Sequence, residues 1–170
     1  MHTRWDTHHT QIRCQKKKME RFSNKREDYW NQIKKELLDT NDSEEFRFQY
    51  LEIGQLLSHG FSVTLNDNNP SEFELKIWNA EYDNKRFNKK IFNLDRLAIK
   101  SKKVKLNSQE SKTINRLLSA ELERTNWGGI VVDGLYCHFE INGRKLDWNT
   151  NEEINNALTE LVELIRNKAA

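Results

Sequence analysis

The dipeptide Asn142-Gly143 constrains this 170-residue chain more than any other feature, because it predicts a β-hairpin of defined register. Asn-Gly is typical of two-residue turns in which both central residues have φ > 0. With the turn at this position, Glu140 lies opposite Lys145 and His138 lies opposite Asp147. Successive strand residues alternate between the two faces. One face of the hairpin is therefore apolar, and it consists of Leu135, Cys137, Phe139, Ile141, Leu146 and Trp148.

A second turn dipeptide, Asp133-Gly134, predicts another strand just upstream of the hairpin. In this register residues 130–132 pair with residues 135–137, and Ile130 and Val132 join the apolar face. A slip of one residue in either turn would scramble that face. We therefore predict a three-stranded antiparallel meander from Ile130 to Trp148.

A helix is expected directly after the meander. Thr150 followed by Glu153 is typical of a capping box, so the helix is predicted to begin at Thr150. Its apolar residues recur at helical spacing and are expected to cover the apolar face of the sheet. They are Ile154, Leu158, Leu161, Val162 and Ile165.

Upstream, helical periodicity predicts one helix from Met19 to Leu38 and a second from about Asp42 to Gly60. The apolar stripe of the second consists of Phe46, Tyr50, Ile53, Leu56 and Leu57. The period then changes to two, which predicts a hairpin that pairs residues 61–65 with residues 73–77. A short strand end near Val104 and a helix from Asn107 or Ser108 to about residues 124–126 complete the pattern.

These elements predict a single α+β domain over residues 19–170, preceded by a flexible basic tail over residues 1–18. Its antiparallel sheet, including the C-terminal three-stranded meander, is expected to pack against amphipathic helices on one side. Five Trp, eight Phe and four Tyr are too many for a disordered chain. The sequence has no apolar run of membrane-spanning length and no secretory signal, so a cytoplasmic protein is expected.

The sequence does not contain the motifs of common catalytic or cofactor sites, so we predict no catalytic residue, no cofactor and no metal. His2, His8, His9 and Cys14 are metal-ligand types, but their spacing matches no ordered zinc pattern. Cys137 and His138 are adjacent in a strand and point to opposite faces, so they do not form a nucleophile–base pair. Cys137 is expected in the core and His138 at the surface.

The strongest charge pattern is a basic segment within residues 84–106, where nine positive residues stand against one acidic residue, Asp95. Phe87 and Phe92 are interleaved, which is typical of nucleic-acid binding. An acidic protein partner is an alternative, and a solvated edge strand protected by lysines is another. Apart from Arg96, the segment consists of Lys85, Arg86, Lys89, Lys90, Lys100, Lys102, Lys103 and Lys105.

The polar face of the C-terminal hairpin is the second candidate surface. Aromatic and alternating charged side chains on a rigid strand pair suit protein recognition, although an ordinary solvated face has the same pattern. The residues are Tyr136, His138, Glu140, Lys145 and Asp147.

Residues 127–166 resemble the C-terminal unit of many small bacterial proteins, some of them of unknown function and others similar to immunity proteins of toxin systems. The shared residues are Asp133, Gly134, Tyr136, Gly143 and Trp148. The resemblance implies a stand-alone protein that binds another protein. We therefore expect a non-enzymatic protein-binding module of the immunity or antitoxin type, with a nucleic-acid-associated protein that uses residues 85–105 as the alternative.

Overall fold

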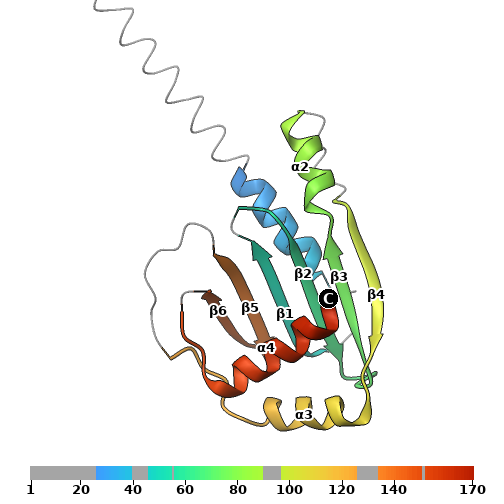
Figure 1. Cartoon of the computed structure of the whole chain (residues 1–170), viewed down its shortest axis with the longest axis vertical. Coiled ribbons are helices and arrows are strands. Elements are labelled where there is room, and N and C mark those ends of the chain that lie inside the picture. Colours follow the sequence, from blue (N-terminus) through green and yellow to red (C-terminus); the bar gives the residue numbers. More distant parts are fainter. Residues whose placement is uncertain (1–25, 40–45, 55, 90–96, 126–133, 151) are drawn as a thin grey trace, which may run out of the picture.

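The computed structural model describes residues 26–39, 46–54, 56–89, 97–125, 134–150 and 152–170. A helix over residues 26–38 precedes a six-stranded sheet of order β4-β3-β2-β1-β5-β6, in which all neighbours are antiparallel. The α+β class is therefore confirmed (Figure 1). After the first helix, the elements are β1 (Phe46–Gly54), β2 (Gly60–Asn66), β3 (Glu72–Trp78), α2 (Ala80–Asn88), β4 (Ile99–Lys105), α3 (Ser108–Leu118), β5 (Leu135–Ile141), β6 (Arg144–Asn149) and α4 (Asn156–Ala169).

The C-terminal hairpin has the predicted register. Glu140 lies opposite Lys145 and His138 opposite Asp147. Asn142 and Gly143 have φ values of 49° and 75°, as the two-residue turn requires. The hairpin of β2 and β3 is confirmed as well, with Val63 opposite Leu75.

The predicted three-stranded meander is not found, because β5 has other neighbours. Leu135 lies opposite Gly54, and Tyr136 lies between Ile53 of β1 and Asn149 of β6. Both edges of β5 are thus occupied, so the predicted pairing of residues 135–137 with residues 130–132 is wrong. Residues 130–132 themselves lie outside the described residues, as does the predicted tail over residues 1–18.

The predicted second helix, from Asp42 to Gly60, is also wrong, because this part of the chain contains the central strand β1. Phe48 and Tyr50 are fully buried on one face of the sheet, and Leu51 and Ile53 are fully buried on the other. A strand that is buried on both faces has no apolar–polar alternation. The spacing of its apolar residues therefore also matched a helix.

Helices cover both faces of this sheet, and not one face as predicted. Buried residues of α3 and α4 share a core with Phe48, Tyr50 and Phe139, whereas the helix over residues 26–38 packs against Leu51 and Ile53. We call these two sides the α4 face and the N-terminal helix face. In Figure 1, α4 crosses the strands diagonally and α3 lies along one end of the sheet. None of the described helices is long and apolar enough to cross a membrane.

The two C-terminal helices differ from prediction at one end each. α4 begins at Asn156, and the Asn155 side chain accepts a hydrogen bond from the Leu158 N–H, so the predicted cap at Thr150 is wrong. The Thr150 hydroxyl instead accepts the N–H of Leu135. α3 begins where predicted, with a capping box of Asn107 and Glu110, but it ends at Leu118. The chain beyond it forms a bridge to the segment before α4, which prevents a longer helix.

Candidate functional site

The polar face of β5 and β6 is connected to the N-terminal helix by a chain of hydrogen bonds. Lys34 Nζ donates to Tyr136 Oη over 3.2 Å, and the Tyr136 hydroxyl donates to the Asp147 carboxylate. His138 Nδ1 lies 2.9 Å from the same oxygen, Asp147 Oδ1. Since a carboxylate only accepts hydrogen bonds, Nδ1 is the donor. Three of the predicted partner-binding residues therefore hold one another in place.

His138 is buried, with 6% of its surface exposed, so the prediction that it lies at the surface is wrong. The N-terminal helix packs on this face, where the ring of Trp30 lies 5.8 Å from that of Tyr136 and Lys34 lies over the same ring. On the other side of the imidazole, Nε2 is 3.8 Å from Glu140, which also pairs with Lys145 over 3.3 Å. Only Lys145 and Asp147 of the predicted set are exposed.

The titration behaviour of this cluster favours a structural role. Burial, and then the hydrogen bond to Asp147, raise the pKa of Tyr136 well above its usual value. Burial also raises the pKa of Asp147, but hydrogen bonds from Tyr136 and His138 outweigh it, and the net pKa lies below 3.8. Tyr136 is therefore neutral and Asp147 charged at neutral pH, which favours the hydrogen bonds that connect helix and sheet.

Cys137 lies on the opposite face, in the core. Its side chain is fully buried, and burial raises the pKa of its thiol to about 12, so it stays protonated at neutral pH. Tyr50 Oη lies 3.6 Å from its Sγ and donates to Glu52 over 2.7 Å. Arg166 Nε donates to the same Glu52 oxygen over 2.7 Å. This group, in which Glu52 is buried and Arg166 is partly exposed, joins β1 to α4. The sequence pattern did not single it out, because β1 was expected to be a helix.

The basic segment divides into two parts of different character. In α2, Lys85 pairs with Glu81 over 2.5 Å and Arg86 pairs with Asp83 over 3.1 Å. Lys89 lies at the C-terminal cap of this helix, and Lys90, Phe92 and Arg96 lie outside the described residues. The ring of Phe87 stacks on that of Tyr29 at 4.8 Å, so it is not available to stack on a nucleobase.

The other part of the basic segment lies on β4, the last strand of the sheet. Lys100, Lys102, Lys103 and Lys105 are all exposed, and Lys103 pairs with Glu72 over 3.0 Å. The other three lysines have no hydrogen-bonded or charged side-chain partner within the described part of the chain. Directly opposite Lys100 in β3 lies Ile77, an apolar side chain with 37% exposure. We call Lys100, Lys102, Lys105 and Ile77 the basic margin.

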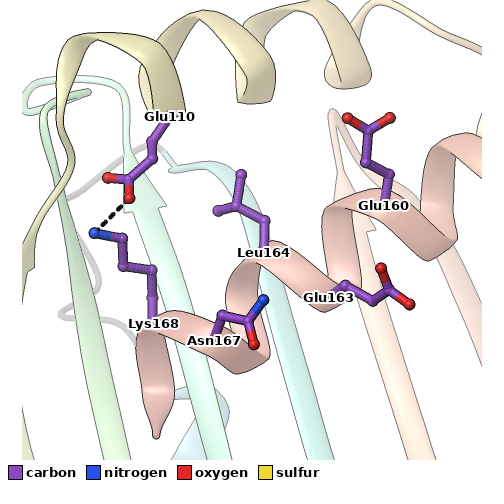
Figure 2. Close-up of a pocket in the computed structure, with 6 residues that line it drawn as sticks. All are labelled: Glu110, Glu160, Glu163, Leu164, Asn167 and Lys168. Carbon is purple, nitrogen blue, oxygen red and sulfur yellow. Dashed lines mark ion pairs between the residues drawn. The ribbon is translucent and has the colours of Figure 1, made fainter.

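Two open grooves are lined mainly by charged residues, and the second includes Lys145 and Asp147 of the predicted partner-binding set. The groove between α3 and α4, of about 480 Å³, is shown in Figure 2. There Glu110 pairs with Lys168 over 2.6 Å, and Glu160 pairs with Arg116 over 2.6 Å, so these charges stabilise the contact between the two helices. The second groove, of about 490 Å³, is lined by Glu123, Arg124, Arg144, Lys145, Leu146 and Asp147. Among the described residues, no group of three or more acidic, histidine or cysteine side chains could hold a metal ion.

The sequence matches no protein-family model, and neither a search of curated proteins nor a search of solved structures finds a match.

Proposed function

We propose that the protein is a non-enzymatic protein-binding module that binds an acidic partner protein through the basic margin. The observation that supports this most directly is that Lys100, Lys102 and Lys105 of β4 are exposed and form no ion pair with the described residues, although Glu72, the partner of Lys103, lies opposite Lys105. β4 itself, Ile99–Lys105, contains no acidic residue. At the other end of the sheet, by contrast, Lys145 pairs with Glu140 and Asp147 pairs with His138.

The physical basis is charge complementarity next to an apolar contact. Lys100 and Lys102 are two residues apart on the α4 face, so their charges repel each other until an acidic group lies between or opposite them. One exposed ion pair contributes only about 0.2–1 kcal/mol. Binding therefore requires several pairs together, and the exposed side chain of Ile77 adds apolar area that water would otherwise cover.

An immunity- or antitoxin-type inhibitor is the specific form of this function that we favour. The resemblance of residues 127–166 to immunity-type proteins supports it, and a rigid sheet would occlude the acidic surface of a partner such as a toxin. Nucleic acid is the second candidate because it is also a polyanion. The stacking of the half-buried Phe87 on Tyr29 argues against nucleic acid, because this ring is already used within the protein and is not offered to a base.

The test compares two defined polyanions with two triple variants. Binding of fluorescent polyglutamate and of a mixed-sequence oligonucleotide is measured by anisotropy in low salt. In Lys100→Glu/Lys102→Glu/Lys105→Glu we expect polyglutamate affinity to fall about tenfold or more, because three favourable charge pairs become repulsive. The control Lys35→Glu/Lys89→Glu/Lys112→Glu makes the same change in net charge at exposed sites elsewhere and should retain affinity.

Two results would contradict the proposal. Equal losses in both triple variants would mean that only net charge matters. Tighter binding of the oligonucleotide than of polyglutamate, weakening steeply between about 50 and 200 mM salt, would favour the nucleic-acid alternative.

A further inference from the structure

The direction of each backbone group in β4 follows from the hydrogen bonds at its two ends. At one end Asn79 N–H donates to the Ala98 carbonyl over 2.8 Å, and at the other Leu106 N–H donates to the Ser71 carbonyl over 2.9 Å. Between them the pairing of β3 with β4 is continuous, without a bulge. In antiparallel strands, hydrogen-bonded and non-hydrogen-bonded pairs alternate. Both ends therefore lead to the same assignment.

By this alternation the backbones of Lys100, Lys102 and Val104 point to β3, and those of Ser101, Lys103 and Lys105 point away from the sheet. The Ser101 and Lys105 N–H groups have no other partner within the described ranges. Among the described residues, β4 is thus an outer strand whose edge is open at Ser101 and Lys105, where further hydrogen bonds can form. An open edge of this kind is the structural requirement for binding a peptide as an additional strand.

We propose that an extended acidic segment of the partner protein adds to β4 as a seventh strand of the sheet. The inference rests on the proposed function and specifies the conformation of the partner. Backbone hydrogen bonds to the outward groups of Ser101 and Lys105 align the segment. Acidic side chains opposite the lysines then select it among extended segments.

The alternation of faces also predicts which positions of the bound segment are acidic and which are apolar. Residues directly opposite each other lie on the same face of a sheet. Acidic residues are expected opposite Lys100 and Lys102 on the α4 face and opposite Lys105 on the N-terminal helix face. An apolar residue is expected opposite Val104, which is partly buried and packs against the core. A slip of one residue would separate the acids from these lysines.

A second copy of this chain is a poor occupant of the same edge. Pairing β4 with β4 would bring two strands together that each contain four lysines and no acidic residue. Like charges across neighbouring strands destabilise the pair, and lysines on edge strands prevent such association for this reason. The same lysines that exclude a second copy favour an acidic strand.

The experiment uses the whole protein and a seven-residue peptide with glutamate opposite Lys100, Lys102 and Lys105 and valine opposite Ile99 and Val104. In Ser101→Pro the outward N–H and the hydroxyl bond to Glu74 are lost, but the backbone bonds to β3 remain, since proline is tolerated where the N–H of an edge strand faces solvent. We expect Ser101→Pro to weaken peptide binding about tenfold or more. Ser101→Ala removes the hydroxyl and keeps the N–H, so it should bind as the wild type does.

Two modified peptides test the backbone hydrogen bonds between the peptide and β4 without changing the protein. N-methylation at the positions opposite Ser101 and Lys105 blocks strand pairing and keeps every charge, so affinity should fall. N-methylation at the positions opposite Lys100 and Lys102, where the N–H groups point away from β4, should leave affinity unchanged. In the complex with the unmodified peptide, amide hydrogen exchange should slow at Ser101 and Lys105.

The outcomes separate the two proposals. If both methylated peptides bind like the parent and exchange at Ser101 and Lys105 does not change, strand addition is wrong and the basic margin binds acidic groups by charge alone. If neither the peptide nor polyglutamate binds at low salt, the proposed function fails together with this inference.

Discussion

The two ends of the sheet both expose charged side chains but differ in how these charges are paired. At the β6 end, Asp147 accepts hydrogen bonds from Tyr136 and His138, and Lys34 of the N-terminal helix completes the chain. At the β4 end, the exposed Lys102 has no such partner among the described residues. The difference arises because the β5–β6 hairpin contains acidic residues that pair with its own side chains, whereas β4 contains none, and because the N-terminal helix adds Lys34. The charges of an outer strand therefore indicate a binding surface only where they lack partners within the protein.

The largest difference in stability between the two ends of the sheet is expected when a core side chain is truncated. Phe139 of β5 is fully buried and stacks on Phe48 with 5.4 Å between ring centroids. Phe139→Ala should lower the free energy of unfolding by about 3–5 kcal/mol, through lost burial and a residual cavity. Val104 of β4 is only partly buried, so Val104→Ala should cost much less. Urea denaturation measures both, and equal losses would show that the two ends contribute equally to the core.

The turn of the β5–β6 hairpin provides the next largest effect. Gly143 has φ of 75°, and a Cβ at this position would meet nothing within 4 Å, so any cost of substitution comes from the backbone. Gly143→Val should destabilise the fold by about 1–3 kcal/mol, because a β-branched residue disfavours positive φ. Gly143→Asn is the matched control, since asparagine tolerates this conformation. An unchanged melting temperature in Gly143→Val would contradict this explanation.

This turn also explains why sequence pattern predicted the hairpin correctly. Asn142-Gly143 determines the pairing of its neighbours locally, so no distant contact was needed. The environment of β1 depends on two strands and two layers of helices distant in sequence, and its apolar spacing fitted a helix equally well. α2 was not predicted because its nine residues are mostly polar.

In the candidate sites, too, local pairing was predictable from the sequence and contacts with distant residues were not. The pairing of His138 with Asp147 was predictable from the register, but its burial depends on Lys34 and Trp30, about a hundred residues away in the sequence. The exposed lysines of β4 were identified by composition alone. Composition did not distinguish them from Lys85, which pairs within its own helix.

The pairing at the β6 end should be visible as a dependence of stability on pH. Because the pKa of Asp147 lies below 3.8 in the folded protein, its charged form contributes stability above that pH. This contribution is lost as the pH falls through the lowered pKa. Asp147→Asn should therefore be less stable than wild type at neutral pH, and the difference should shrink in acid. Urea unfolding of both proteins from about pH 6 to pH 2 measures it. A constant difference would mean that the carboxylate charge is not involved.

The smallest effect is expected at the β4 end, where Lys102→Ala should change the free energy of unfolding by no more than about 0.5 kcal/mol. The substitution also removes the repulsion between Lys102 and Lys100, which lie on the same face. Binding of polyglutamate should nevertheless weaken in the same variant, since stability and binding depend on different contacts there. A loss of stability above about 1 kcal/mol would show that Lys102 has a structural partner. The contrast between a paired end and an available end of the sheet would then no longer hold.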